Sequence, residues 1–229
     1  MKFDKYNRTA RIYPSIIILI PFLIFTIDCD IDGLKDVFDD LLKIRIVGNI
    51  TIAIALLYLL IQINRFLGKF FFEKNLFKDE LKMPTTNFLL FSDSQFSEEY
   101  KLKIRRKILK DFKINLPTKQ YESNHTEDKR KQIAEAVGLI RQKVKNGRLL
   151  LQHNIEYGFA RNLTGGSVIG LLMSIGDLVY FNAHANELLF YISLCLSFVF
   201  LLLLSIHKPI IRHLGNQYAK RLFQEYLQK

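Results

Sequence analysis

The chain has 229 residues, of which 33 are Lys or Arg and 22 are Asp or Glu, for a formal net charge of +11, and 49% of its residues are hydrophobic. This composition excludes a disordered chain and predicts apolar residues gathered into blocks, as in a membrane protein that carries a polar domain. The only cysteines, Cys29 and Cys195, lie far apart, which excludes a secreted disulfide scaffold and a structural zinc site built from cysteines.

Four blocks of sequence are candidates for crossing a bilayer. They are Ile12–Ile27, Ile46–Asn64, Asn162–Asn186 and Leu188–Ile206. The second and fourth each have 19 uncharged residues, and the third has 25 residues with one charge, Asp177. A spanning helix needs about 20 apolar residues, so these three blocks predict transmembrane helices. The first block is the shortest, with 16 uncharged residues.

The first block follows a basic stretch, so a cleaved signal peptide is the alternative to a transmembrane helix. Cleavage requires small residues before the cut, whereas Thr26, Ile27 and Asp28 precede Cys29. We therefore expect the block to be retained as a helix. Pro21 is expected to kink that helix, because proline removes a backbone hydrogen bond.

The charges of the connecting segments predict the orientation. Residues 1–13 have a net charge of +3, residues 28–45 of −3, residues 65–161 of +9 and residues 207–229 of +4. Positively charged connections tend to remain in the cytoplasm. Four crossings with both termini and the middle section in the cytoplasm satisfy this bias at every connection. The acidic loop then faces outward.

The chain divides into three predicted parts. Residues 1–68 form transmembrane helices 1 and 2, residues 69–160 form a basic cytoplasmic domain, and residues 161–229 form transmembrane helices 3 and 4 with a basic tail. Phe66–Phe77 continues the second helix, Pro84 ends it, and Thr86–Phe91 is expected to be a short strand or extended piece. The fold class is mainly α and integral to the membrane, with a middle domain that is helical or α+β.

Two amphipathic helices are predicted in the middle domain, one from about Ser97 to Phe112 with Ser94 or Ser97 as its cap, and one that begins at Thr126. Their apolar positions are Tyr100, Ile104, Ile108 and Phe112 in the first and Ile133, Val137, Ile140 and Val144 in the second. Gly147 either breaks the second helix or lets it run into the third block.

The basic faces of these helices have two interpretations. Lysines beside a membrane can contact anionic lipid headgroups and satisfy the topology, or clustered cations can bind a polyanion such as a nucleotide or single-stranded nucleic acid. The predicted ligand contacts are Lys103, Arg106, Lys107, Lys110, Arg141 and Lys145. The aromatic residues nearby are not spaced as a stacking platform.

A dense polar segment precedes the third block. It comprises His153, Asn154, Glu156, Tyr157, Arg161 and Asn162. These residues form either a hydrogen-bonded collar, in which Glu156 pairs with Arg161, or a gate that couples the cytoplasmic domain to a pore through a charge network with two arrangements.

The third block carries small residues and one acid on a single helical face. These residues are Gly166, Gly170, Ser174 and Asp177. The small residues let helix backbones approach closely, and an acid inside a membrane span suggests a function. If the face lines an oligomer axis, a ring of Asp177 copies favours cations. Alternatively, Asp177 snorkels to the outer surface or bonds a polar neighbour such as Asn49. A single chain has no room for an aqueous channel, so conduction requires a homo-oligomer.

Catalytic and metal-binding motifs are absent from the sequence. It has no Gly-rich phosphate loop with a lysine, no HExxH, no Gly-x-Ser-x-Gly and no paired His and Cys cluster. We therefore expect no enzyme activity, no metal and no cofactor.

Two short stretches carry a resemblance to known proteins. They are HNIEYGFARNLTGGS at 153–167 and PTTNFLL at 84–90. With two spans before and two after, they resemble the small bacterial four-span effectors of anti-phage defence systems, most of all the Hailong effector. The resemblance implies an oligomeric inner-membrane channel. It also implies that a single-stranded DNA oligomer, made by a nucleotidyltransferase encoded nearby, keeps the channel closed until infection destroys that oligomer.

The leading hypothesis is an oligomeric bacterial inner-membrane protein that depolarises the membrane when its basic cytoplasmic domain gains or loses a polyanionic ligand. The alternative is a membrane scaffold that conducts nothing and recruits a cytoplasmic protein partner through the same helices.

Overall fold

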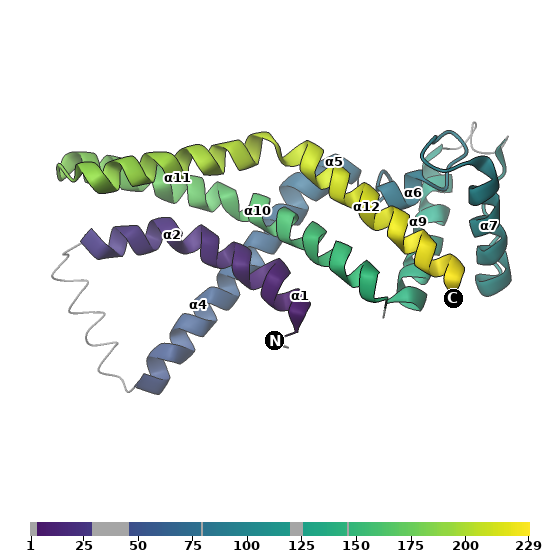
Figure 1. Cartoon of the computed structure of the whole chain (residues 1–229), viewed down its shortest axis with the longest axis horizontal. Helices are drawn as coiled ribbons and strands as arrows, with labels where there is room; N and C mark the ends of the chain where they lie inside the picture. The colour runs from purple at the N-terminus through teal and green to yellow at the C-terminus, as the bar shows by residue number, and fades with distance from the viewer. Residues whose placement is uncertain (1–3, 29–45, 79, 120–125, 146) are drawn as a thin grey trace. The chain divides into compact units, whose positions relative to one another are not determined.

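The computed structural model describes residues 4–28, 46–78, 80–119, 126–145 and 147–229 (Figure 1). Most of these residues are helical and none lies in a β-strand, so the mainly α expectation is confirmed and the α+β alternative is wrong for this part of the chain. The stretch expected to be extended begins inside helix α6 (Pro84–Asn87) and continues as turns. Pro84 stands at the start of α6, where its fixed φ suits a helix and its missing N–H costs nothing.

Four helices are long and apolar enough to cross a membrane, as in a multi-pass membrane protein. They cover Lys5–Thr26, Ile54–Phe77, Leu150–Ala183 and Glu187–Ser205. The first is longer than its 16-residue uncharged block, because α1 (Lys5–Asn7), the π-helical stretch η1 (Arg8–Ile12) and α2 (Tyr13–Asp28) follow without a break. Pro21 lies inside α2, and the helix continues through it.

The second helical run includes the expected continuation Phe66–Phe77, but Lys78 and not Pro84 ends it. It consists of α4 (Ile46–Leu67), the π-helical stretch η2 (Gly68–Glu73) and α5 (Lys74–Phe77). Lys78 terminates it by adopting a left-handed conformation with φ of 45°, six residues before Pro84.

The long helix α10 (Arg148–Ala183) settles the alternatives at Gly147. Helix α9 (Thr126–Val144) ends before this glycine, and α10 then runs into the third apolar block without interruption. The chain turns back into α11 (Glu187–Ser205), and α12 (His207–Gln228) follows.

Two compact units are formed, and they are not contiguous in the sequence. Unit 1 comprises Met1–Phe72 and Phe159–His207, and unit 2 comprises Glu73–Gly158 and Lys208–Lys229. These divisions near 72 and 158 lie close to the expected ones at 68 and 160. The tail differs from the expectation, because residues 208–229 belong with the middle section and not with the last two apolar helices.

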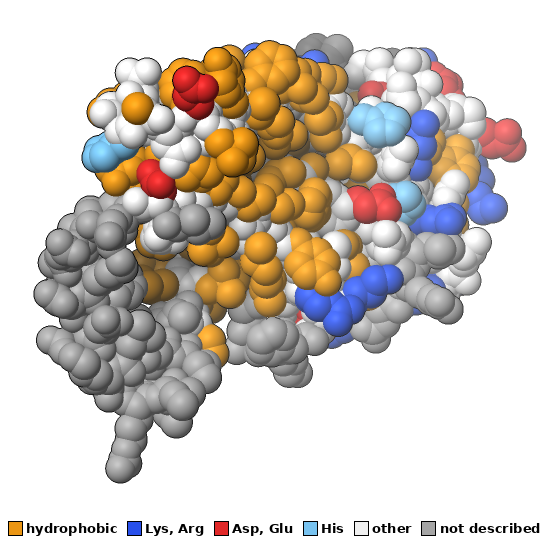
Figure 2. Space-filling model, turned by 60° about the vertical axis from the view of Figure 1, so that its left-hand side comes forward, with side chains coloured by type: hydrophobic (Ala, Val, Ile, Leu, Met, Phe, Trp, Pro, Cys, Tyr) orange, Lys and Arg blue, Asp and Glu red, His pale blue; other side chains and the backbone are white. Residues whose placement is uncertain are grey.

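Unit 1 is built from the four apolar helices. Helix α2 contacts both α4 and α11. The outward side chains of unit 1 are apolar: on α10 and α11, Leu172, Val179, Leu188 and Phe198 are each about two-thirds exposed. Figure 2 shows a broad surface of hydrophobic side chains that few charges interrupt. A soluble protein rarely exposes so much contiguous apolar surface, so this surface suits a lipid environment.

Unit 2 has a conventional hydrophobic core. Helices α7 (Glu98–Phe112), α9 and α12 and the turns after α6 supply it. Fully buried members are Leu89, Ile104, Ile108, Ile133, Val137, Ile140, Val144, Leu222, Phe223 and Tyr226. The predicted helices are confirmed, including Ser97 as the cap of α7, whose hydroxyl accepts a bond from Tyr100 N at 3.2 Å. The role of α12 was not anticipated.

Candidate functional site

Helix α10 and the run α4–η2 pack with almost no side chain between them. A β-carbon on Gly165 would lie 2.4 Å from both the carbonyl oxygen of Asn64 and the amide nitrogen of Gly68. A β-carbon on Gly68 would lie 2.6 Å from the carbonyl oxygen of Arg161. Real β-carbons do not approach other atoms so closely, so only glycine fits here. The small residues of α10 therefore bring two helix backbones together.

The residues predicted to line a pore face other helices of the same chain. A β-carbon on Gly166 would meet Ile18 of α2 at 2.6 Å, and one on Gly170 would meet the ring of Phe200 on α11 at 2.7 Å. Ser174 is fully buried, and its hydroxyl donates a 2.8 Å hydrogen bond to the carbonyl of Gly170. In this packing the face is covered within one chain, whereas an oligomer axis would require it to be open.

Asp177 lies one turn further along α10 and is only 4% exposed. Its Oδ2 atom is buried and finds no hydrogen-bond donor among the described residues. The hydroxyl oxygens of Ser193 and Ser197 on α11 are also buried and lack a partner in that part of the chain. An unsatisfied buried polar group costs about 1–3 kcal/mol, so these three are not there for stability.

These polar groups lie within about one turn of one another along the α10–α11 hairpin. Two antiparallel helices with the same rise per residue keep positions at equal steps from a contact on one level. Because Phe200 meets Gly170, Ser193 is level with Asp177, which lies seven residues after Gly170 in α10 as Ser193 lies seven residues before Phe200 in α11. We call Asp177, Ser174, Ser193 and Ser197 the polar layer.

One end of the hairpin is tied to the first helix run. The amide of Asn186 donates a 2.8 Å hydrogen bond to Asp28 Oδ1, and its side-chain oxygen caps α11 by accepting from Leu189 N at 3.2 Å. The rest of the acidic loop and the side chain of Asn49, the expected alternative partner of Asp177, lie outside the described residues.

The predicted gating residues fall on both sides of the division between the units. His153, Asn154, Glu156 and Tyr157 belong to unit 2, and Arg161 and Asn162 belong to unit 1. Both groups lie on the uninterrupted helix α10. Glu156 accepts a hydrogen bond from Gln152 at 2.9 Å and lies 3.5 Å from His153 Nδ1.

Asn162, a unit 1 member of this segment, binds the first helix run. Asn162 is almost fully buried, and its amide donates a 2.6 Å hydrogen bond to the carbonyl of Ala10. Arg161 donates to the side chain of Asn162, with Nε at 3.4 Å. Asn64 of α4 bonds Ser15 of α2 at 3.1 Å in the same buried region.

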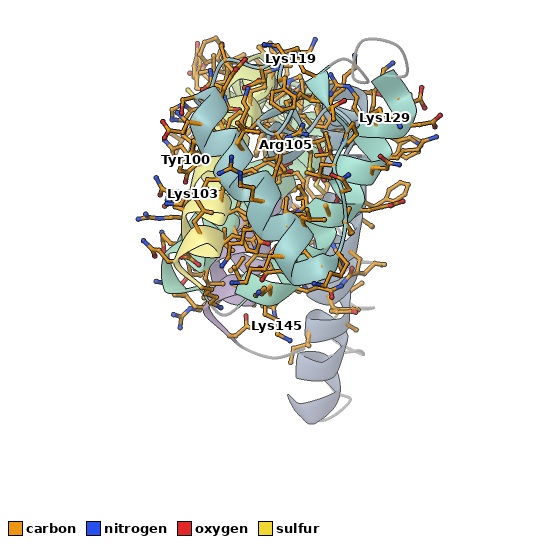
Figure 3. The ribbon with its side chains drawn as sticks, turned by 90° about the vertical axis from the view of Figure 1, so that its right-hand side faces the viewer. Tyr100, Lys103, Arg105, Lys119, Lys129 and Lys145 are labelled. Atoms are coloured by element: carbon orange, nitrogen blue, oxygen red, sulfur yellow. The ribbon has the colours of Figure 1, made fainter. Side chains whose placement is uncertain are left out.

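The predicted ligand-binding residues do not converge on one groove. Lys103, Arg106 and Lys110 are exposed on α7, and Lys145 is exposed after α9. In Figure 3 Lys103 and Lys145 point away from unit 2 on different sides. Arg141 is engaged within the fold: its guanidinium holds Glu80 in two hydrogen bonds of 2.9 and 3.0 Å and donates to Thr85. Arg141 is therefore a structural residue as well as a predicted ligand contact.

A basic cluster at the end of α12 was missed in the sequence. Tyr226 donates a 2.9 Å hydrogen bond to Asp111 Oδ2, and Lys143 Nζ lies 2.7 Å from the same oxygen. Lys107 lies 5.5 Å from the Tyr226 ring centre, and Lys229 donates to the carbonyl of Lys143. The hydrogen bond from Lys143 lowers the pKa of Asp111, and burial raises the pKa of Tyr226. The apolar spacing of α12 was the signal that could have revealed this cluster.

Within the described ranges, no three His, Cys, Asp or Glu side chains come together as a metal site. No protein-family model, curated protein or solved structure matches the chain. Its function must therefore be argued from the polar layer and the basic surface themselves.

Proposed function

We propose that this chain is one subunit of a homo-oligomeric ion channel in the bacterial inner membrane, and that a polyanion bound to unit 2 controls it. The observation that carries the proposal is the buried Asp177 carboxylate oxygen, which has no donor among the described residues and lies inside a candidate membrane span. Such a group costs the fold stability, whereas rings of acidic side chains are one way in which pores favour cations.

The packing described above corresponds to a closed state in this proposal. The polar layer faces helices of its own chain, so ions cannot reach Asp177. Opening then consists of moving α10 against α2 and α11, which exposes the polar layer to a pathway shared between subunits. Close backbone packing at Gly165 and Gly68 favours such discrete arrangements, because two rigid surfaces either fit or separate.

The charge of the chain's segments supports the proposed membrane orientation and the proposed polyanionic ligand. Residues 65–161 and 207–229, which contain unit 2, carry net charges of +9 and +4, and the positive-inside bias supports a cytoplasmic position for them. The exposed cations of α7 suit a phosphate backbone. The resemblance to Hailong-type effectors suggests a single-stranded DNA oligomer made by a partner nucleotidyltransferase, and a role in defence against phage.

The test is ion flux from liposomes that contain the purified full-length protein, with and without a short single-stranded DNA on the side of unit 2. We expect cation flux that changes with the oligonucleotide. Asp177→Asn should lower the flux about thirtyfold, since a unit charge about 8 Å from an ion contributes about 2 kcal/mol at an effective dielectric constant of about 20.

Glu187→Gln is the matched control, because Glu187 belongs to the same hairpin and is exposed. It should leave the flux unchanged. Equal flux in wild type and Asp177→Asn would remove Asp177 from the pathway. Tight liposomes under every condition, with insertion verified, would favour the scaffold that recruits a protein partner.

A further inference from the structure

Unit 2 contains a cavity that none of the sites above uses. Its volume is about 600 Å³, and it lies among α5, the turn that follows α5 and the first half of α9. The lining residues are Lys74, Asn75, Lys78, Leu81, Lys82, Glu127 and Arg130. Four of these seven are basic and one is acidic, so the cavity has a strongly positive potential.

The backbone of the turn after α5 fixes two of the lysines on one wall. Lys78 has a left-handed conformation with φ of 45°, and its carbonyl accepts a hydrogen bond from Leu81 N at 3.1 Å. Lys82 N donates to the carbonyl of Phe77 at 2.8 Å. Two residues separated by four positions are thereby held beside the same cavity.

Arg130 of α9 is held in place by hydrogen bonds to this turn and to α6. Its Nη1 atom donates hydrogen bonds to the carbonyl of Leu81 at 2.9 Å and to Asn87 Oδ1 at 2.6 Å. A guanidinium has five N–H donors in a fixed plane, and these two bonds involve only one of its nitrogens. The arginine is therefore oriented without consuming its whole donor set, which suits recognition of a tetrahedral oxyanion.

Two described acids near the cavity lie beside other cations. Glu80, in the turn between Lys78 and Lys82, is held by Arg141 at 2.9 and 3.0 Å. Glu127 lies 3.9 Å from Lys131, one helical turn further along α9. Both interactions reduce the competition of these carboxylates for the cavity cations.

We propose that this cavity binds a phosphate group, presented either by an anionic lipid headgroup or by a soluble phosphate compound. Lys74 and Asn75 are among the last residues of the candidate span Ile54–Phe77, so a lipid phosphate is within reach if that helix crosses a bilayer. The inference is independent of the proposed channel and of the basic face of α7.

The experiment uses the full-length protein and has one arm for each possible source of the phosphate group, a soluble compound or a lipid. In detergent, inorganic pyrophosphate is titrated and the melting temperature is followed. In nanodiscs, phosphatidylcholine is compared with mixtures containing phosphatidylglycerol. We expect saturable stabilisation in at least one arm, because a ligand that binds only the folded protein raises its stability with concentration. The responding arm identifies the source of the phosphate.

The variants are Lys82→Gln and the double variant Lys78→Gln/Lys82→Gln, both at exposed positions. Each lysine removed should weaken the apparent affinity about fivefold, as expected for one charge near an anionic surface. Lys103→Gln/Lys110→Gln on α7 removes the same charge elsewhere and should leave the affinity unchanged. No saturable response in either arm, or an equal loss in the α7 control, would overturn the proposal. Lys82→Gln alone keeps the test valid if the double variant does not fold.

Discussion

Two buried cations of unit 2 differ from an acid and two serines buried in unit 1 in whether they find hydrogen-bond partners. In unit 2, Arg105 is 9% exposed and donates to the carbonyls of Leu89 and Pro117, and Lys101 donates to the carbonyl of Asp93. In unit 1, Asp177, Ser193 and Ser197 bury oxygens that find no partner in the described part of the chain. Lys101 and Arg105 therefore support the fold of unit 2, whereas the unpartnered oxygens of Asp177, Ser193 and Ser197 cost stability and suggest a function. Unit 2 also has such atoms, since Arg141 Nε and Glu225 Oε2 are buried without a partner among the described residues.

The units also differ in how their helices associate. The helices of unit 2 bury aliphatic side chains between them, which water drives together. The helices of unit 1 expose aliphatic side chains and meet through glycine. Lipid provides no hydrophobic drive between helices, so close backbone contact must stabilise unit 1 instead.

The largest effect is expected from a single methyl group at Gly165. Gly165→Ala places a β-carbon 2.4 Å from two backbone atoms of the neighbouring run, which must separate from α10. We expect a loss of about 3 kcal/mol or more in the free energy of unfolding, measured in detergent. Gly176→Ala on the same helix meets nothing within 4 Å and should stabilise by up to about 1 kcal/mol. Similar effects of the two variants would show that close packing is not what holds unit 1 together.

The second-largest effect on stability is expected at Arg105, whose guanidinium connects two loops of unit 2. Arg105→Met leaves the carbonyls of Leu89 and Pro117 without their donor, and should cost about 2–4 kcal/mol. Arg106→Met, at the adjacent exposed position, should change stability by less than about 0.5 kcal/mol. Denaturant unfolding monitored by circular dichroism checks both variants, and equal effects would contradict the role given to Arg105.

Replacing Asp177 in the polar layer should raise the free energy of unfolding, whereas Gly165→Ala and Arg105→Met lower it. Asp177→Leu replaces an unsatisfied carboxylate with an apolar side chain of similar branching, and should raise the free energy of unfolding by about 1–3 kcal/mol while abolishing ion flux. Ser193→Ala should be neutral or stabilising, whereas Ser174→Ala removes the hydroxyl bound to Gly170 and should destabilise slightly. A destabilised Asp177→Leu would mean that the carboxylate supports the fold.

The smallest effect concerns Asp111, whose pKa is lowered by its hydrogen bond with Lys143. A carboxyl with a lowered pKa in the folded state stabilises above its unfolded pKa, and that contribution is lost as pH falls through the folded value. Asp111→Asn should therefore cost about 1 kcal/mol at pH 7, and the difference from wild type should shrink below about pH 4. Glu135→Gln, at an exposed position of α9, should show no such pH dependence in thermal melts.

Much of the architecture could be predicted from the sequence, because periodic apolar residues determine it directly. The stripes through Ile104 and Ile108, and through Ile133 and Val137, became the core of unit 2. The four apolar blocks became the four long apolar helices. These features depend on local spacing, which a single sequence displays.

The features that could not be predicted depend on contacts between residues that are far apart in the sequence. Arg141 was read as a surface cation, and its partner Glu80 is 61 positions away. The cover over the α10 face comes from Ile18 and Phe200, and no local pattern identifies which helices meet in lipid. Helix α12 could have been found, because Ile211, Gly215 and Ala219 recur every four residues, but its charges were interpreted only as a topology signal.

The position of α12 has a consequence for biosynthesis. Leu222, Phe223 and Tyr226 complete the core of unit 2, and the side chain of Glu225 accepts a 2.9 Å hydrogen bond from Leu150 N. Helices α10 and α11 are synthesised before them. The ribosome must therefore deliver all four apolar helices to the insertion machinery before unit 2 can close, so a nascent chain has its membrane part in place before it has a finished basic unit.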